Sequence, residues 1–375
     1  MLYTMTMPIA PNGTRVPYIH RVESLDWQRG LLAVSIMIYH LIFWHGETTP
    51  ASSVLGRLGI YAVSMFFVLS GLSMAIAYER YELTIKNATH FYTRRIFRIW
   101  PLLWLAIFAV TAKSLILKED GISIYKIILN LTTAFGFIEP SAYLNTGAWS
   151  IGNEMVYYAL TPFILFAYRK NIFYGNLLTL ASIAIGIFYA FDFITPALTL
   201  EAQWRTYIQP SNNLFFYMMG IAIYYNSRKT APHFTIATTC ILLTACIFII
   251  TPSTESDSSI VTGINRIIFS TTSVLMVFGF FKLPPILPAA IAYPLERLGV
   301  ITYGVYLLHP IVNSATTMLL VKLNWQLTTP ATIILISLLT ITAANIAYEV
   351  IEKPMIRLGK NLTTNRPRKS SQTLN

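Results

Sequence analysis

The chain has 375 residues, of which 55% are hydrophobic and 11% are charged, and its formal net charge is +11. A soluble domain carries about a quarter charged residues, so this composition excludes an ordinary soluble protein and indicates an integral membrane protein. Apolar segments run almost from end to end, and we expect one membrane domain over residues 1–359. Residues 360–375 are basic and polar, which predicts a disordered cytoplasmic tail.

Ten apolar segments approach the roughly 20 residues that a helix needs to cross a bilayer. They predict an all-α polytopic bundle of about ten transmembrane helices. Segment 122–138 is apolar enough for an interfacial or re-entrant helix and is not counted. The ten segments cover about 30–47, 57–78, 99–117, 149–168, 172–191, 213–227, 233–252, 263–282, 299–321 and 328–351.

The basic residues predict an orientation for these segments. With the N-terminus in the cytoplasm, twenty of the 27 Lys and Arg residues fall on the cytoplasmic side and seven on the other. The positive-inside rule then places both termini in the cytoplasm. Topology thus accounts for the net positive charge, and no nucleic acid partner is expected. Cys240 and Cys246 lie about 120° apart around one helix, so we expect no disulfide between them.

Arg29 and His40 lie eleven residues apart on the first apolar segment. At 100° per residue this spacing puts both on one helix face, separated by about 16 Å along the axis. If Arg29 lies at a membrane surface, His40 lies near the midplane, where ionisable groups are costly and usually functional. An imidazole there can be a general base, a proton relay or an acyl acceptor. Asp26 either orients Arg29 or caps the helix.

Three arginines, Arg94, Arg95 and Arg98, lie just before Pro101, where we expect the third span to begin after an amphipathic interfacial stretch. Guanidinium groups clustered at a cytoplasmic helix mouth can bind phosphates. A juxtamembrane topology anchor or an anionic lipid site would show the same pattern.

Two further runs place polar side chains inside predicted spans. Trp149 begins one span, followed by Glu154 about 8 Å below its start and by Tyr157. Glu154 could pair with His40 or orient an acceptor hydroxyl, or it could form a structural hydrogen bond. The other run extends from Tyr303 to His309, which precedes a proline that suggests a kink at a cavity. His309 is either catalytic or a packed polar residue.

Other motifs point to structure. Ser70 and Gly71 indicate close helix packing, and Glu349 and Glu352 mark the interfacial end of the last span. The sequence has no HExxH motif, paired CxxC, phosphate-binding glycine loop or Gly-x-Ser-x-Gly elbow, so we expect no metal site.

The ordered set of motifs resembles the acyltransferase-3 family of multi-spanning membrane acyltransferases, and the resemblance covers nearly the whole chain. The matching elements are Leu25 to Gly30 leading to His40, Phe66 to Gly71, Arg94 to Arg98 with Pro101, Trp149 and Ser150 with Glu154, Tyr303 to His309, and Glu352 to Pro354.

The resemblance implies a ten-helix enzyme of a bacterial inner membrane. Such an enzyme moves an acetyl or similar acyl group from cytosolic acyl-CoA to a carbohydrate hydroxyl. Arg29 and His40 would then be the essential pair, with Glu154 assisting on the acceptor side. Arg94, Arg95 and Arg98 would bind the CoA phosphates. Candidates for the substrate cavity are Trp149, Tyr157, Tyr303 and His309.

These features predict an acetyl-CoA-dependent O-acetyltransferase acting on a surface glycan such as lipopolysaccharide O-antigen or another polysaccharide. His40 would either deprotonate the acceptor or carry the acetyl group briefly, and the sequence does not choose between these routes. The alternative is a transporter or exporter of a glycan or lipid-linked intermediate, since ten spans with midplane ionisable groups suit that class too. Against it, the halves show no repeat.

Overall fold

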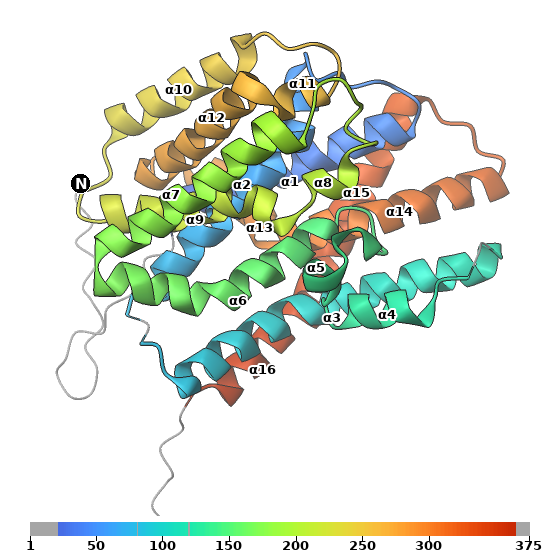
Figure 1. The fold of residues 1–375 in the computed structure, drawn as a ribbon. Helices are drawn as coiled ribbons and strands as arrows, with labels where there is room; N and C mark the ends of the chain where they lie inside the picture. The colour runs from blue at the N-terminus through green and yellow to red at the C-terminus, as the bar shows by residue number, and fades with distance from the viewer. Residues whose placement is uncertain (1–21, 81, 119–120, 365–375) are drawn as a thin grey trace, which may run out of the picture.

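The structure is a computed structural model that describes residues 22–80, 82–118 and 121–364. Ten helices of 17 or more residues in this part of the chain correspond in order to the ten predicted spans, and they confirm an all-α polytopic bundle (Figure 1). Six of the described helical segments are long and apolar enough to cross a membrane. The ten are α1 (Glu23–Trp44), α2 (Val54–Ala77), α3 (Ile85–Leu117), α6 (Trp149–Lys170), α7 (Ile172–Phe188), α9 (Pro210–Ser227), α10 (Phe234–Ile250), α12 (Gly263–Lys282), α14 (Thr302–Lys322) and α15 (Thr329–Ala347).

Short helical pieces connect or extend the long helices. Segment 122–138 folds into α4 and α5, which at 8 and 4 residues are too short to cross a bilayer. The short pieces are α4 (Ile124–Leu131), α5 (Phe135–Ile138), the 3₁₀ turn η1 (Pro140–Ala142), the π turn η2 (Tyr189–Phe193), α8 (Trp204–Tyr207), α11 (Ser258–Val261), α13 (Ala289–Val300), the π turn η3 (Tyr348–Glu352) and α16 (Lys353–Leu362).

Helix α2 lies at the centre of the bundle and packs against α1, α6, α9 and α12. Ser53 caps its first turn by accepting a hydrogen bond from the amide of Gly56 at 3.0 Å. Gly71 and Gly220 let α2 and α9 approach closely. A Cβ on Gly71 would lie 2.0 Å from the Tyr217 carbonyl oxygen, and one on Gly220 would lie 2.0 Å from that of Val68. The predicted close helix packing at Gly71 is therefore confirmed.

Helix α3 differs from the prediction at its N-terminal half. We expected a span from residue 99 after an interfacial stretch, but a single helix runs from Ile85 to Leu117 with Pro101 inside it. A proline in a helix interior removes one backbone hydrogen bond, and packing against α14 and α16 holds the helix together across that position. The three arginines of the motif therefore lie within one rigid helix.

The last span also continues further than expected. Helix α15 passes through the π turn η3 directly into α16, which lies along α3 (Figure 1). The domain boundary expected at residue 359 therefore falls inside α16. Residues 360–362 are helical, and residues 365–375 of the expected tail lie outside the described residues.

Helix α13 was not predicted from the sequence. It packs on the first half of α1, where Gly299 lies so close that an added Cβ would be 2.2 Å from the Asp26 carbonyl oxygen. This contact holds the beginning of α14 beside Arg29.

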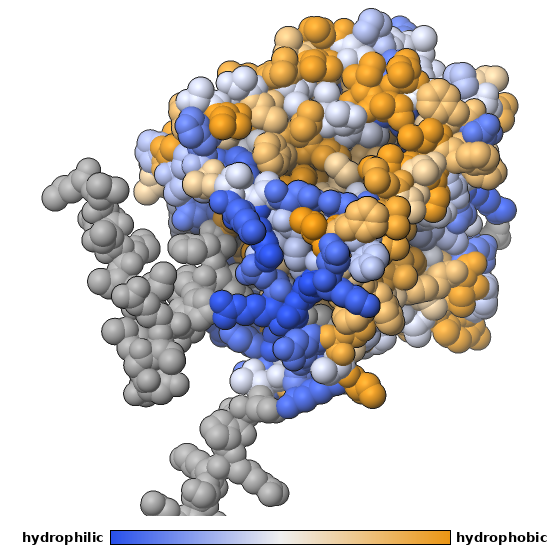
Figure 2. All heavy atoms as spheres, turned by 60° about the vertical axis from the view of Figure 1, so that its left-hand side comes forward, coloured by the Kyte–Doolittle hydropathy of each residue, from blue (hydrophilic) through white to orange (hydrophobic). Residues whose placement is uncertain are grey.

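One end of the bundle has a polar surface. Figure 2 shows hydrophilic residues gathered beside the end of α16, with apolar residues covering much of the remaining face.

Candidate active site

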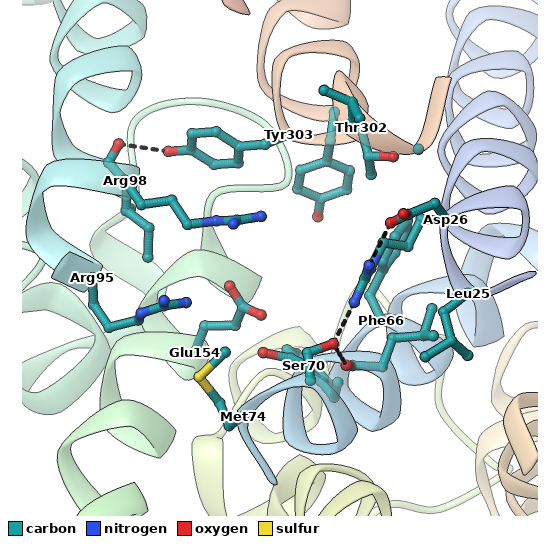
Figure 3. A pocket seen from close by; sticks show the side chains of 18 of the residues that line it. Leu25, Asp26, Phe66, Ser70, Met74, Arg95, Arg98, Glu154, Thr302 and Tyr303 are labelled. Carbon is teal, nitrogen blue, oxygen red and sulfur yellow. Dashed lines mark hydrogen bonds and ion pairs between the residues drawn. The ribbon is translucent and has the colours of Figure 1, made fainter. Parts of the chain in front are cut away.

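A cavity of about 580 Å³ lies between α1, α2, α3, α6 and α14, with η3 and α16 forming a further wall (Figure 3). Cavities of this size commonly hold small-molecule ligands. It lies between the first half of α1, the last half of α2 and the beginning of α14, and it extends to Ser150 and Tyr306. Of the residues predicted from the sequence, Arg29, Arg95, Arg98, Glu154 and Tyr303 line it.

Arg29 is held by two neighbours on the cavity wall. Its guanidinium donates to the Asp26 carboxylate at 2.8 Å and also to the Ser73 hydroxyl. Helix α1 has Val22 at its N-cap position and no side-chain capping bond. Asp26 thus orients Arg29, which is one of the two roles left open by the sequence.

Arg95 and Arg98 face Glu154 across one end of the cavity (Figure 3). Arg95 lies over the rings of Tyr78 and Tyr158, with its central carbon 5.8 Å from each ring centroid. The Glu154 carboxylate interacts electrostatically with both guanidinium groups. A guanidinium group stacked on an aromatic ring keeps the N–H groups in its own plane free to donate hydrogen bonds to a ligand.

Arg94 takes a different direction from its two neighbours. Its Nε atom donates to the Thr363 hydroxyl at 2.7 Å, and it is absent from the residues lining the cavity. The structure therefore brings two of the three predicted phosphate ligands to the cavity and places the third against the segment that follows α16.

Several polar residues of the cavity wall were not selected from the sequence as site residues, among them Ser70 and Glu352. Ser70, expected only to serve helix packing, bonds the Tyr158 hydroxyl at 3.0 Å inside the cavity. Glu352, expected at an interfacial exit, lies in η3 with only 4% of its surface exposed, and its Oε1 atom has no hydrogen-bond partner. The sequence feature that could have selected Glu352 as a site residue is its position as a carboxylate at the end of an apolar span.

His40 and His309 form a pair beside the cavity. The Nδ1 atom of His40 lies 2.9 Å from Nε2 of His309, and Trp44 stacks on both imidazole rings. Neither histidine lines the cavity, but Tyr306, which does, has its ring centroid 6.2 Å from that of His309. His40 lies four residues before the end of α1, and His309 lies seven residues after the beginning of α14.

Of the remaining candidates, Trp149 and Tyr157 lie outside the cavity lining. Trp149 packs edge-on against Phe67 and Trp204. The Tyr157 hydroxyl donates to the Pro210 carbonyl at 2.9 Å. Tyr303 lines the cavity, and its hydroxyl donates to the Ile99 carbonyl at 2.8 Å, so it also fixes α14 against α3.

A family model described as an acyltransferase domain matches residues 22–349. The chain belongs to the acyltransferase-3 family. It is 24% identical over 283 residues to a candidate acetyltransferase of Acidianus two-tailed virus, covering 75% of this chain and 80% of that protein. It is also 24% identical over 373 residues to the peptidoglycan O-acetyltransferase OatA of Listeria monocytogenes, covering 90% of this chain and 56% of OatA. No solved structure matches the chain.

Membership in the acyltransferase-3 family makes the protein a multi-pass membrane O-acyltransferase. The chain spans little more than half the length of the Listeria relative. The family implies an acyl donor, and the cavity is where two of the three predicted donor-binding side chains, Arg95 and Arg98, meet.

Proposed function

We propose that the protein transfers an acetyl group from acetyl-CoA to a hydroxyl of a bacterial surface glycan, such as O-antigen or another polysaccharide. The observation that carries this proposal is the cavity, in which Arg29, Arg95 and Arg98 direct cationic groups into a space of about 580 Å³. The relative named as a peptidoglycan O-acetyltransferase supports a glycan acceptor and an acetyl donor.

Arg95 and Arg98 would hold the phosphates of CoA, since a guanidinium group matches phosphate geometry with paired donors. Arg98 is exposed at the cavity end, which suits a charged group entering from water. The pantetheine arm would extend along the apolar wall formed by residues such as Phe66 and Ile151, toward Tyr306. Arg29, fixed by Asp26 and Ser73, would orient the donor beside the His40 pair.

His40 would act on the reacting groups through one imidazole nitrogen. In direct transfer it takes the proton of the acceptor hydroxyl while the hydroxyl oxygen bonds to the acetyl carbonyl carbon. The carbon–sulfur bond then breaks, and the leaving thiolate of CoA takes the proton from the imidazole. In the stepwise route the same nitrogen first bonds to the acetyl carbonyl carbon as the carbon–sulfur bond breaks. The acceptor hydroxyl oxygen then takes the acetyl group from the nitrogen, and its proton passes to the thiolate of CoA. Glu154 would assist on the acceptor side in either route.

Release of free CoA from acetyl-CoA tests this proposal. Membranes containing the wild-type protein or His40→Ala would be supplied with extracted surface glycans, and the glycan would be analysed for acetyl ester. Glycan-dependent CoA release that requires His40 is the expected result. CoA release unchanged in His40→Ala would contradict the assigned role, and a wild-type protein that binds no acetyl-CoA would contradict the activity itself.

A further inference from the structure

The hydrogen bonds around His309 fix which nitrogens carry protons. Its Nδ1 atom lies 3.1 Å from the carbonyl oxygen of Val305, one turn earlier in α14. A carbonyl oxygen only accepts hydrogen bonds, so Nδ1 of His309 carries a proton. The carbonyl of Tyr306 adds a second acceptor nearby, because its usual helical donor would be the amide of residue 310, which is proline.

A neutral His309 then has an unprotonated Nε2 atom that can only accept. This nitrogen lies 2.9 Å from Nδ1 of His40, so His40 must donate through Nδ1. The charged form of His309 is disfavoured because the side chain is 0% exposed, and no carboxylate in the described part of the chain forms an ion pair with it.

We propose that His309 is a positioning residue that holds His40 in the tautomer with its proton on Nδ1 and a free lone pair on Nε2. The chain of donors runs from His40 through His309 to the Val305 carbonyl. This inference rests on the proposed function for its catalytic meaning, but it concerns a hydrogen-bond chain that exists without substrate. Base catalysis and acetyl transfer through His40 both need the free lone pair.

The same geometry serves the protonated state of His40. When Nε2 takes the acceptor proton, the Nδ1–H bond to His309 becomes a charge-assisted hydrogen bond, which is stronger than a neutral one. Trp44 stacks on both rings, with centroid distances of 5.1 Å to His40 and 5.6 Å to His309, and the planes of the two imidazole rings are nearly parallel, at 8° to each other. The pair therefore resembles a nucleophile or base with its orienting partner, with a second histidine in the place of a carboxylate.

Solid-state NMR of histidine-labelled protein in bilayers reads the tautomer directly. The chain has six histidines, and subtraction of the His40→Ala spectrum identifies the His40 signals. We expect the Nδ1–H tautomer in the wild type and loss of that fixed state in His309→Leu. A wild-type His40 protonated on Nε2, or a tautomer unchanged in His309→Leu, would overturn the proposal. His45→Leu is the matched control, because it removes the 3.1 Å contact between His45 and Asn313 while sparing the pair.

Two variants of His309 test the catalytic consequence. His309→Gln can place an amide oxygen near the Nε2 position and accept from His40, whereas the shorter His309→Asn reaches only toward Val305. We expect Gln to retain most of the acetyl transfer rate, and Asn to lose about a hundredfold or more, as when a base is held in the wrong tautomer. Equal losses in both variants would contradict the positioning role. If the wild type transfers no acetyl group, the proposed function fails, while the NMR experiment still decides the tautomer.

Discussion

At the scale of single residues, the direction in which each arginine side chain of α3 points decides whether it can bind the acyl donor. Arg95 and Arg98 line the cavity, three residues apart on one face of the helix, and Arg94 bonds Thr363. The sequence could not make this distinction, because Arg94 and Arg98 also share a face at a spacing of four residues. Which face meets the cavity is decided by the packing of α3 against α14 and α16.

Replacing both Arg95 and Arg98 by Gln should raise the KM for acetyl-CoA by about a hundredfold or more. Each hydrogen bond to a charged group contributes about 1.5–3 kcal/mol, and about 1.4 kcal/mol corresponds to a factor of ten. Initial rates measured against acetyl-CoA concentration give this value. Arg94→Gln, which removes the same charge from the same helix, should leave the KM within about threefold; a rise in Arg94→Gln equal to that of the double variant would assign phosphate binding elsewhere.

Glu154 and Glu352 should differ in their effects. Glu154 faces the guanidinium groups, and Glu352 is buried with a free Oε1 atom in the cavity wall. We expect Glu154→Gln to lower kcat at saturating acetyl-CoA by at least about tenfold, because a positioned carboxylate is lost from the acceptor side. The matched variant Glu352→Gln keeps the shape of the wall and should change the acetyl-CoA KM more than kcat. Wild-type kcat in Glu154→Gln would reduce this residue to a structural role.

The predictable part of the site follows from helix periodicity and chemistry. Arg29, Glu154 and Tyr303 could be selected because each is polar within an apolar segment, and all three line the cavity. The contact between His40 and His309 joins positions 269 residues apart. No periodicity within one helix can report such a contact, since it depends on how α1 and α14 pack.

At the scale of elements, buried arginines tie the helices together through backbone carbonyls. Arg57, near the beginning of α2, is 3% exposed and donates to the carbonyls of Phe248, Ile249 and Thr251 at the end of α10, and to that of Ala51. The last carbonyls of a helix lack partners within it and favour a cation. This one side chain therefore caps α10 and anchors it to α2.

Arg57→Met should destabilise the protein by about 3 kcal/mol or more, because it leaves several buried carbonyls without donors. Thermal unfolding in detergent, followed by tryptophan fluorescence, would show a lowered Tm. Arg205→Met provides the control, since Arg205 is exposed on α8 and the substitution removes the same charge. Equal Tm values for the Arg57 and Arg205 variants would show that α10 is capped in some other way.

The close approach of α2 and α9 gives a second stability prediction. Gly220→Ala places a methyl group 2.0 Å from the Val68 carbonyl oxygen, so the two backbones must separate. Overpacking of this kind costs about 1–3 kcal/mol, and we expect the Tm to fall accordingly. Gly121→Ala, at a position with nothing within 4 Å of the added carbon, should not change it. An unchanged Tm in Gly220→Ala would mean that the helices separate at no cost.

The elements themselves were largely predictable, and their ends were not. Apolar segments near 20 residues identified all ten long helices. Helix α13 was missed because it has 12 residues and an internal proline, so it does not show the length of a span. The continuous helix α3 and the π turn η3 depend on mutual packing of α3, η3 and α16, which local propensity does not report.

At the scale of the whole molecule, the cavity lies toward the end of the bundle that carries most of the basic residues. The beginnings of α1 and α14, the first half of α3 and the end of α2 surround the cavity, and these parts carry basic residues expected in the cytoplasm. We therefore expect acetyl-CoA to enter from the cytoplasm. The His40 pair lies further along α1, toward the opposite end, where a glycan acceptor would approach.

The most direct test of this account is transfer of radiolabelled acetyl groups by sealed vesicles of known orientation. Vesicles containing the wild-type protein or His40→Ala would receive labelled acetyl-CoA on one face and glycan on the other. We predict label on the glycan only when acetyl-CoA is on the cytoplasmic face, and none with His40→Ala. Labelled glycan from His40→Ala, or wild-type transfer only when acetyl-CoA is on the opposite face, would contradict the account.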